Sequence, residues 1–384
     1  MLTEEELEAA IERILSRLND VNRLFIKKIA AQIMKIGELN ASSVHRIITM
    51  TEMGTDIRDI SNALSNATKA NIRDIYGIFQ AALKSTYTDP RFKPALLSHS
   101  LSGAQNARLA QLAQNISAQT AQAMVNLSNT TAITPRYKDA IDRAVLATAS
   151  GLSSYQEAAR DVIRDLGYNG LQVQYDSGYH RRLDTAVRQN IVDGVNQINQ
   201  NASLAMGEAL GYDAVEISAH ANSAPDHEPV QGRVFLLSEF AKMQSGQDFQ
   251  DIHGRYYEGF KRPIGEWNCM HIAMAFSTEH SIPRYTEAQL KNWERDNKKG
   301  CEICGKHYTT YQARQLMRQL ETQVRHEKDA AVAAQLNGND MEARRAHQKV
   351  INSLSKRYYA VAKASGLTPR GARLSVNGFK MVKV

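Results

Sequence analysis

The fold is decided by the stretch HRRLDTAVRQNIVDGVNQINQNASLAMGEALGYDAVEISAH, residues 180–220, where one apolar repeat gives way to another. From His180 to Leu210 the apolar residues recur at the spacing of one helix face, and Gly211 can end that helix. Residues 215–219 then alternate between apolar and polar, as in a strand with one buried face. The stretch therefore predicts a long helix that leads into a small mixed α+β unit.

Helical patterns also dominate the chain before this stretch. Apolar residues between Ile11 and Ile29 follow the i, i+3, i+4 spacing of an amphipathic helix. Residues 100–130 are rich in Gln, Asn, Ser and Ala, but their apolar residues still recur at roughly helical spacing, which predicts a polar helix with disorder as the alternative. We expect a further helix to end at Gly167, and a first strand to cover residues 171–175.

After residue 220 the sequence predicts a long loop followed by two helices. A short apolar segment, Val234–Leu237, is followed by a Gly-rich loop that we expect to reach about residue 268. Thr309 and Gln312 then form a capping box, which predicts the start of a long helix. A polar break at residues 337–340 separates this helix from a partner that ends before Gly366, so we expect an αα-hairpin.

Together these patterns predict an α+β fold that is predominantly helical. A chain of 384 residues suits two or three folding units, since an average domain has about 150 residues. We expect a helical N-terminal region over 1–133, a central α+β domain over 134–300, and a C-terminal αα-hairpin with a basic tail over 301–384.

Composition excludes several classes of protein. With 43% hydrophobic and 23% charged residues, the chain is too apolar for global disorder and too polar for a membrane protein. No run of about 18 apolar residues occurs, and the first residues are acidic where a signal peptide would be basic. The three cysteines are too few for a disulfide framework, which suits folding in a reducing cytosol.

Positive charge is concentrated at the C-terminal end. Residues 341–384 hold ten basic side chains and one acidic one, whereas the remaining 37 basic and 39 acidic side chains nearly cancel. Clustered positive charge attracts nucleic acid, although a basic helix that merely faces water or an acidic partner protein is an equal alternative. The predicted nucleic-acid contacts are Arg344, Arg345, Lys356, Arg357, Lys363, Arg370, Arg373 and Lys380.

Two groups of histidine and cysteine are candidate zinc sites. The denser group is His220, His227, Cys269 and His271, whose side chains are of the types that bind zinc. The second group is Cys301, Cys304 and His307, in which the Cys-x2-Cys pair resembles half of a zinc knuckle. The alternative is that the cysteines are small core residues and the histidines are hydrogen-bonded.

A catalytic interpretation competes with zinc binding. Cys269 with His271 or His227 could form a thiolate–imidazole pair, with Asp226 or Glu228 orienting the base. The chain has no phosphate-binding glycine loop, so nucleotide hydrolysis, as in a motor or a kinase, is not expected. It also has no set of paired acids at the spacing of a nuclease.

Five segments occur in a characteristic order along the chain. They are YDSGYHRRLDTAVRQNI (175–191), VEISAHANSAPDHEPVQGRVF (215–235), IGEWNCMH (264–271), GKHYTTYQARQLMRQLETQVRHEKDAA (305–331) and KASGLTPRGARLSVNGF (363–379). In this order they resemble the phage minor capsid protein 2 family, which is similar to head-morphogenesis proteins related to the Mu F protein. In that family the Cys301–Cys304 pair is not expected.

The resemblance implies a structural protein of tailed-phage heads and not an enzyme, made in the bacterial cytoplasm and built into the virion. The implied partners are the portal protein, the major capsid protein and packaged double-stranded DNA, with no membrane and no small-molecule substrate. By the same resemblance, the four residues of the denser group fall on recurring polar positions of the family, as a metal-bound or hydrogen-bonded structural knot. The alternative function is a metal-dependent or cysteine enzyme carried in the virion and delivered with the DNA.

Overall fold

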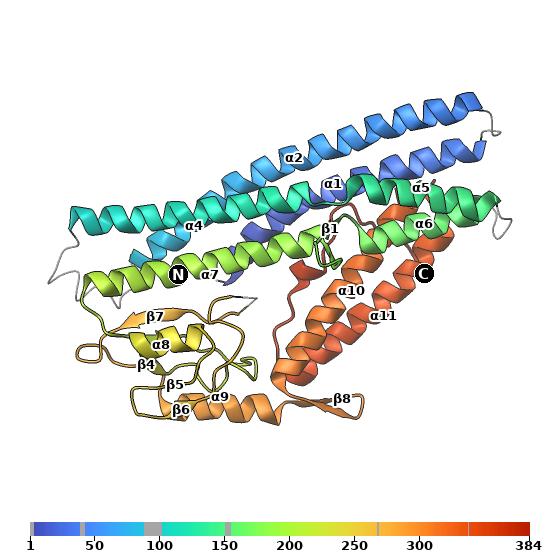
Figure 1. Cartoon of the computed structure of the whole chain (residues 1–384). Coiled ribbons are helices and arrows are strands. Elements are labelled where there is room, and N and C mark those ends of the chain that lie inside the picture. Colours follow the sequence, from blue (N-terminus) through green and yellow to red (C-terminus); the bar gives the residue numbers. More distant parts are fainter. Residues whose placement is uncertain (1–3, 39–42, 88–101, 150–154, 267–268, 337) are drawn as a thin grey trace. The chain divides into compact units, whose positions relative to one another are not determined.

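Helices form most of the computed structural model, which confirms a predominantly helical α+β fold (Figure 1). The structure describes residues 4–38, 43–87, 102–149, 155–266, 269–336 and 338–384. Its helices are α1 Glu4–Glu38, α2 Ser43–Tyr87, α4 Gly103–Asn129, α5 Ile133–Ala149, α6 Tyr155–Asn169, α7 Leu183–Ala209, α8 Leu237–Gln244, α9 Glu287–Lys299, α10 Thr310–Leu336, α11 Met341–Ser365 and the 3-10 turn η1 Gly371–Leu374. Its strands are β1 Gln172–Gln174, β2 His180–Arg182, β3 Ala214–Ile217, β4 Val234–Leu236, β5 Phe249–Gln250, β6 Tyr256–Tyr257, β7 Ala273–Phe276, β8 Cys301–Ile303 and β9 Lys306–Tyr308.

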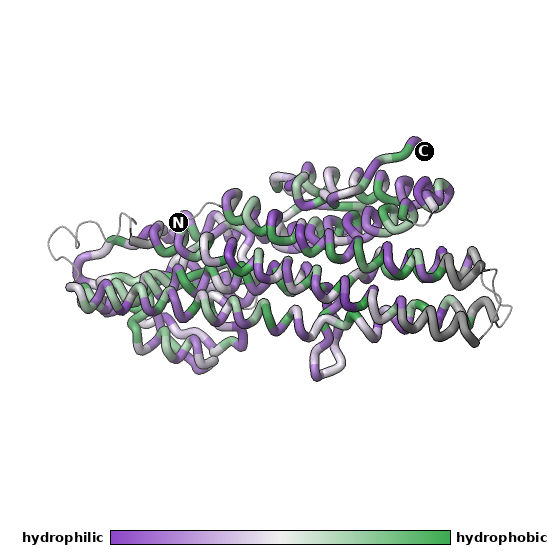
Figure 2. The backbone as a smooth tube through the Cα atoms, turned by 90° about the horizontal axis from the view of Figure 1, so that it is seen from above, coloured by the Kyte–Doolittle hydropathy of each residue, from purple (hydrophilic) through white to green (hydrophobic). Residues whose placement is uncertain are grey.

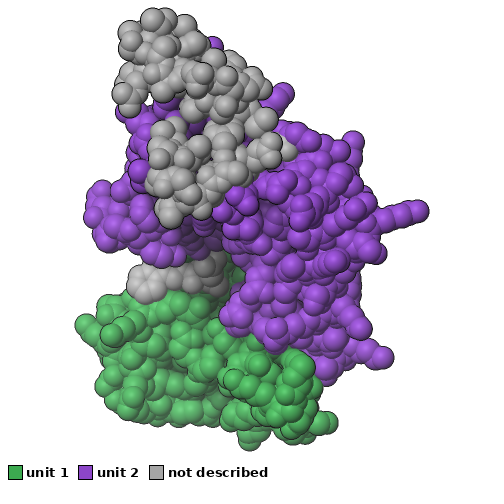
Figure 3. All heavy atoms as spheres, turned by 90° about the vertical axis from the view of Figure 1, so that its right-hand side faces the viewer, with its two compact units in different colours: residues 1–11, 72–124, 188–314 green, residues 12–71, 125–187, 315–384 purple. Residues whose placement is uncertain are grey.

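The chain divides into two compact units, each assembled from three separate segments (Figure 3). Unit 1 contains residues 1–11, 72–124 and 188–314, and unit 2 contains residues 12–71, 125–187 and 315–384. Neither unit is continuous in sequence, because several long helices begin in one unit and end in the other. This grouping into two discontinuous units is a different kind of division from three consecutive domains. The domain boundaries expected from the sequence stay a prediction.

Unit 1 is built around a three-stranded antiparallel sheet in the order β4-β3-β7. Val215 of the central strand pairs with Phe235 on one side and Ala275 on the other. Helix α7 packs on β7 so closely that a Cβ on Gly207 would lie 2.3 Å from the Cβ of Ala275. Glycine at this position is therefore required by the helix–strand contact.

The loop expected after Val234–Leu237 contains regular structure that the sequence analysis missed. Helix α8 begins at Leu237 and buries Phe240 and Met243, and the hairpin β5–β6 follows it. The apolar spacing of α8 covers only two turns, which is too short for a clear helical period. The helix expected from His180 also begins later, at Leu183, because residues 180–182 pair with β1 as strand β2.

Unit 2 contains most of the predicted αα-hairpin of α10 and α11, and the first turn of α10 belongs to unit 1 (Figure 1). The capping box that starts α10 is present: the backbone N–H of Thr309 donates to Gln312 Oε1 (3.0 Å), and the N–H of Gln312 donates to Thr309 Oγ1 (3.1 Å). Gly366 has the left-handed conformation (φ 68°) that ends α11. Both ends of the hairpin thus agree with the sequence.

Gly167 does not end its helix, contrary to expectation. It lies inside α6, where a Cβ would come within 2.5 Å of the Cα of Ala330 in α10. The glycine allows two helices to approach closely, and the helix continues to Asn169. A sequence pattern cannot distinguish this packing role from a helix stop.

The long helices are amphipathic, as the sequence predicted. Hydrophobic and hydrophilic residues alternate along the tube in Figure 2. The polar segment before residue 130 forms helix α4, whose apolar residues Ile116, Met124 and Leu127 are buried, so the helical prediction is confirmed. Among the described residues, no helix is long and apolar enough to cross a membrane.

Candidate metal centre and basic surfaces

Three of the predicted zinc ligands meet inside unit 1. The ligand atoms of His227, Cys269 and His271 all lie within 4.8 Å of one another, and the three residues are 0%, 1% and 2% exposed. His227 belongs to the connection from β3 to β4, whereas the other two residues precede β7. Because β3 pairs with both β4 and β7, the sheet brings these distant parts of the chain together.

In each imidazole of this cluster, one ring nitrogen faces the sulfur of Cys269 and the other ring nitrogen faces an oxygen atom. The Nδ1 atoms of His227 and His271 lie 3.2 Å and 3.5 Å from Cys269 Sγ. His227 Nε2 lies 2.8 Å from the carbonyl oxygen of Arg262, and His271 Nε2 lies 3.2 Å from Ser223 Oγ. The arrangement fixes both rings and places their Nδ1 atoms around one sulfur.

Burial controls the electrostatics of the cluster. It lowers the pKa of His227, and it lowers the pKa of His271 further with the help of the neighbouring histidines. It also raises the pKa of the Cys269 thiol. In the absence of a cation, both imidazoles are therefore neutral at pH 7.

His220 lies beside the cluster but outside it. Its ring stacks on the ring of His271, with centroids 4.4 Å apart, and its Nδ1 lies 3.1 Å from the carbonyl oxygen of Ala221. The structure thus assembles three of the four predicted ligands and places the fourth as a stacking neighbour.

The residues expected to orient a catalytic base have other partners. Asp226 forms an ion pair with Arg262 at 2.8 Å, and its other oxygen is 3.8 Å from His227 Nε2. Glu228 accepts a hydrogen bond from Asn297 Nδ2 at 2.7 Å. With its thiol buried as well, Cys269 does not have the surroundings of an accessible nucleophile.

The second zinc candidate lies in the hairpin β8–β9. Cys304 occupies the exposed turn with φ 51°, and Cys301 pairs with Tyr308 across the hairpin. His307 Nε2 contacts the carbonyl oxygen of Lys299 at 2.9 Å. Within the part of the chain that the structure describes, these residues do not gather into a group of metal-ligand atoms.

The predicted nucleic-acid contacts divide into two groups. Arg345, Lys356, Arg357, Lys363 and Lys380 are exposed. The other members are at least partly buried and are treated separately below.

Arg344 is a predicted nucleic-acid contact, but it is buried. Its guanidinium donates to Asn339 Oδ1 (2.5 Å) and to the carbonyl oxygen of Lys380 (3.2 Å), so it holds the tail against α11. Arg373 is partly buried, with Nη1 3.7 Å from Glu321 Oε2, and Arg370 is also partly buried. Tail packing therefore removes Arg344 from the surface available to DNA.

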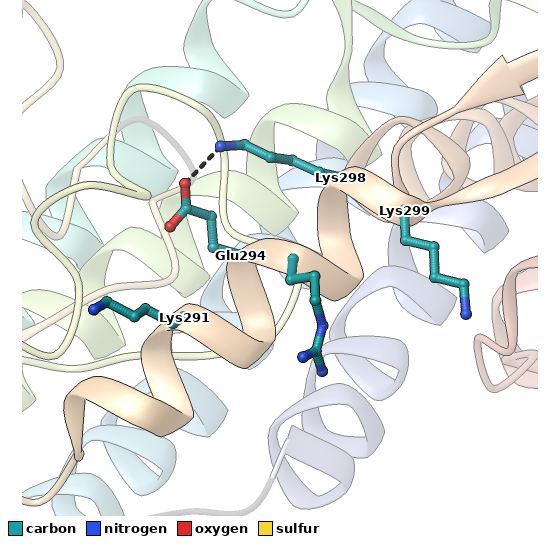
Figure 4. A pocket seen from close by; sticks show the side chains of 5 residues that line it. Lys291, Glu294, Lys298 and Lys299 are labelled. Atoms are coloured by element: carbon teal, nitrogen blue, oxygen red, sulfur yellow. Dashed lines mark hydrogen bonds and ion pairs between the residues drawn. The ribbon is translucent and has the colours of Figure 1, made fainter.

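Helix α9 carries a second basic surface that the sequence analysis overlooked. Lys291, Glu294, Arg295, Lys298 and Lys299 line an open pocket on this helix (Figure 4). One of the lysines, Lys298, forms an ion pair with Glu294 at 2.5 Å. The four cations recur in the sequence at the spacing of one helix face, which is a signal for such a surface. The signal is absent from the charge count over the whole chain, because acidic residues elsewhere balance these cations.

Comparison with known proteins identifies the family of the chain. No curated protein and no solved structure gives a significant match. The family model described as phage minor capsid protein 2 matches residues 2–359, which include His227, Cys269 and His271 and most of the αα-hairpin. Because the match covers nearly the whole chain, the protein belongs to the phage minor capsid protein 2 family.

Proposed function

We propose that this minor capsid protein is a structural component of the phage head that associates with the portal and contacts packaged double-stranded DNA. The observation that carries the DNA contact is a row of exposed cations along one face of α11. The portal and the major capsid protein are the partners that the family resemblance implies.

The row consists of Arg345, Lys349, Lys356 and Lys363, which we call the α11 stripe. All four side chains are exposed. At 3.6 residues per turn, their spacing places them within roughly 40° of arc around the helix, and a rise of about 1.5 Å per residue spreads them over roughly 27 Å. The opposite face of α11 is buried through Ile351, Tyr358 and Val361.

The α11 stripe suits the backbone of DNA. Duplex DNA carries about one negative charge per 1.7 Å of axis, so a straight row of cations can approach several phosphates. Glu342 is the one acidic residue in the segment 341–384, so this segment itself adds little negative charge against the stripe. Contacts to phosphates carry no sequence information, which suits a genome that presents arbitrary sequence to the protein.

The cysteine cluster favours a structural role over an enzymatic one. A substrate would have to reach Cys269, His227 or His271, and all three are at most 2% exposed. The alternative of a cysteine or metal enzyme delivered with the DNA therefore lacks an accessible reacting group at this cluster.

Mass spectrometry of purified, DNA-filled particles tests the proposal. We expect the protein in the particles at a constant ratio to the portal protein, with the lysate of infected cells as the reference. Its absence from purified particles, with abundant protein in the lysate, would contradict a structural role.

A further inference from the structure

We infer that His227 Nδ1, Cys269 Sγ and His271 Nδ1 bind a zinc ion inside unit 1. This inference is independent of the α11 stripe and of the portal. It rests on the number of hydrogen atoms available to the cluster and on its geometry.

The protonation of His227 follows from its partner. Its Nε2 lies 2.8 Å from the carbonyl oxygen of Arg262, and a carbonyl oxygen only accepts hydrogen bonds. Nε2 therefore carries the hydrogen of the neutral imidazole. The Nδ1 atom is left with a lone pair that points at Cys269 Sγ, 3.2 Å away.

The same reasoning applies to His271. Its Nε2 lies 3.4 Å from Gln231 Oε1, and that oxygen also accepts the backbone N–H of His220 at 3.1 Å. Gln231 Oε1 is therefore an acceptor and favours a hydrogen on Nε2, and the Ser223 hydroxyl, 3.2 Å from Nε2, can accept the same hydrogen or donate to the ring. With the hydrogen on Nε2, the lone pair of His271 Nδ1 points at the sulfur of Cys269, 3.5 Å away.

A thiol cannot satisfy both lone pairs. Cys269 has a single S–H hydrogen, so without a cation one of the two Nδ1 atoms depends on another donor, and for His227 that donor is Arg262 Nη2 at 3.4 Å, which is long for a hydrogen bond. The backbone N–H of His271 also points at the sulfur, at 3.4 Å, and so favours an electron-rich sulfur. A cation bound by a thiolate and two imidazoles satisfies all three ligand atoms.

The distances fit zinc. With Zn–S bonds of about 2.3 Å and Zn–N bonds of about 2.0–2.1 Å, a tetrahedral site places sulfur and nitrogen about 3.6 Å apart. The two Sγ–Nδ1 distances of 3.2 Å and 3.5 Å are close to this value.

The surroundings resemble the outer shell of a metal site. The second nitrogen of each histidine is fixed by oxygen atoms, from Arg262 on one side and from Ser223 and Gln231 on the other. The guanidinium of Arg262 lies 3.4 Å from His227 Nδ1, but its charge is offset by Asp226 at 2.8 Å. Zinc would replace this weak contact.

The site would stabilise unit 1. It would tie the β3–β4 connection to the segment that enters β7, far from solvent, with three ligands from the described residues and the fourth position of a tetrahedral ion left to another donor. His220 stacks flat on His271 and is not part of the ligand set that we infer.

The test uses the purified full-length protein. We expect about one zinc per chain by elemental analysis, and after exchange with Co²⁺ we expect an absorption band for charge transfer from thiolate to cobalt. The Cys269→Ser variant should lose the band, and His227→Ala and His271→Ala should lose most of the bound metal. Two matched controls should keep both the band and the bound metal. One is the double variant with Cys301→Ser and Cys304→Ser, and the other is His220→Ala.

Two results would overturn the inference. One is folded wild-type protein that contains no zinc and develops no cobalt band after incubation with either metal. The other is a band that survives in Cys269→Ser and disappears in the Cys301/Cys304 variant. If the Cys269 variant does not fold, a chelator added to the wild type decides: zinc release with a lower melting temperature supports the site, and an unchanged protein contradicts it.

Discussion

His347 Nδ1 lies 2.7 Å from Glu327 Oε2, so a buried hydrogen bond joins α11 to α10. The hydroxyl of Tyr168 in α6 donates to the other oxygen of the same carboxylate. Burial alone would raise the pKa of Glu327, but these two hydrogen bonds outweigh it and hold the pKa below its ordinary value. One ionised side chain therefore connects three helices of unit 2.

Replacing Glu327 by Ala should destabilise unit 2. The change leaves His347 and Tyr168 without their shared acceptor, and loss of hydrogen bonds to a charged group costs about 2–3 kcal/mol. Urea unfolding followed by far-UV circular dichroism measures the effect. The control is Glu342→Ala, an exposed position on α11 that should change stability by less than about 0.5 kcal/mol. Equal stability of the two variants would contradict the role of Glu327.

Acid should weaken unit 2 through His326. Burial, together with the charges of Arg182 and Arg325, lowers the pKa of His326 to about 4, whereas the unfolded chain has the ordinary value of about 6.5. As pH falls below 6.5, the unfolded state takes up the proton first, so the free energy of unfolding decreases between pH 6.5 and 4, by at most about 3 kcal/mol.

The His326→Gln variant isolates this effect from other titrating groups. Relative to the variant, the wild type should lose stability between pH 6.5 and 4 and not above pH 7. Parallel curves of unfolding free energy against pH for the two proteins would show that His326 does not carry the dependence.

Tyr358 should hold the C-terminal tail on the hairpin. Its hydroxyl donates to Glu321 Oε1 (3.0 Å) and accepts the backbone N–H of Arg370 (2.7 Å). Tyr358→Phe removes both bonds, at a cost of about 1–3 kcal/mol, and should make residues after Gly366 more sensitive to limited proteolysis. The neighbouring and exposed Tyr359 supplies the control Tyr359→Phe. An unchanged cleavage rate in the Tyr358 variant would refute the prediction.

The α11 stripe should determine the salt dependence of DNA binding. Replacing its four cations by Gln should weaken binding to duplex DNA and reduce the slope of log K against log salt by about 3 to 4, since each phosphate contact contributes about 0.9. Fluorescence anisotropy with duplexes of unrelated sequence measures both quantities. The control removes the four cations of α9, Lys291, Arg295, Lys298 and Lys299, which gives the same net charge. A larger loss in this control than in the stripe variant would place the DNA contact elsewhere.

The sequence predicted those parts of the fold that depend on local signals. The capping box at Thr309 and the glycine at 366 define the ends of the hairpin, and both act through neighbouring backbone atoms. The zinc-type residues were also recognisable by side-chain chemistry. The proximity of these residues in space was not predictable from the sequence, because it depends on the pairing of β3 with β4 and β7.

Sequence patterns led to wrong predictions for features that depend on contacts between residues far apart along the chain. Gly167 has the local signature of a helix end, but its position is explained by Ala330 in another helix. Arg344 has the spacing of an outward residue, but the tail folds back and accepts its hydrogen bond through the carbonyl of Lys380. Residues 180–182 continue a helical pattern, but pairing with β1 makes them a strand.

The most direct test of the proposed role is photo-crosslinking from position 356 in intact particles. A photoreactive amino acid replaces Lys356 in the α11 stripe, and purified DNA-filled particles are irradiated and then treated with nuclease. We predict an adduct of the protein with DNA that nuclease shortens, and a much weaker one from position 298 on α9. Particles that contain the protein but give only protein adducts from position 356 would contradict contact between the α11 stripe and the packaged DNA.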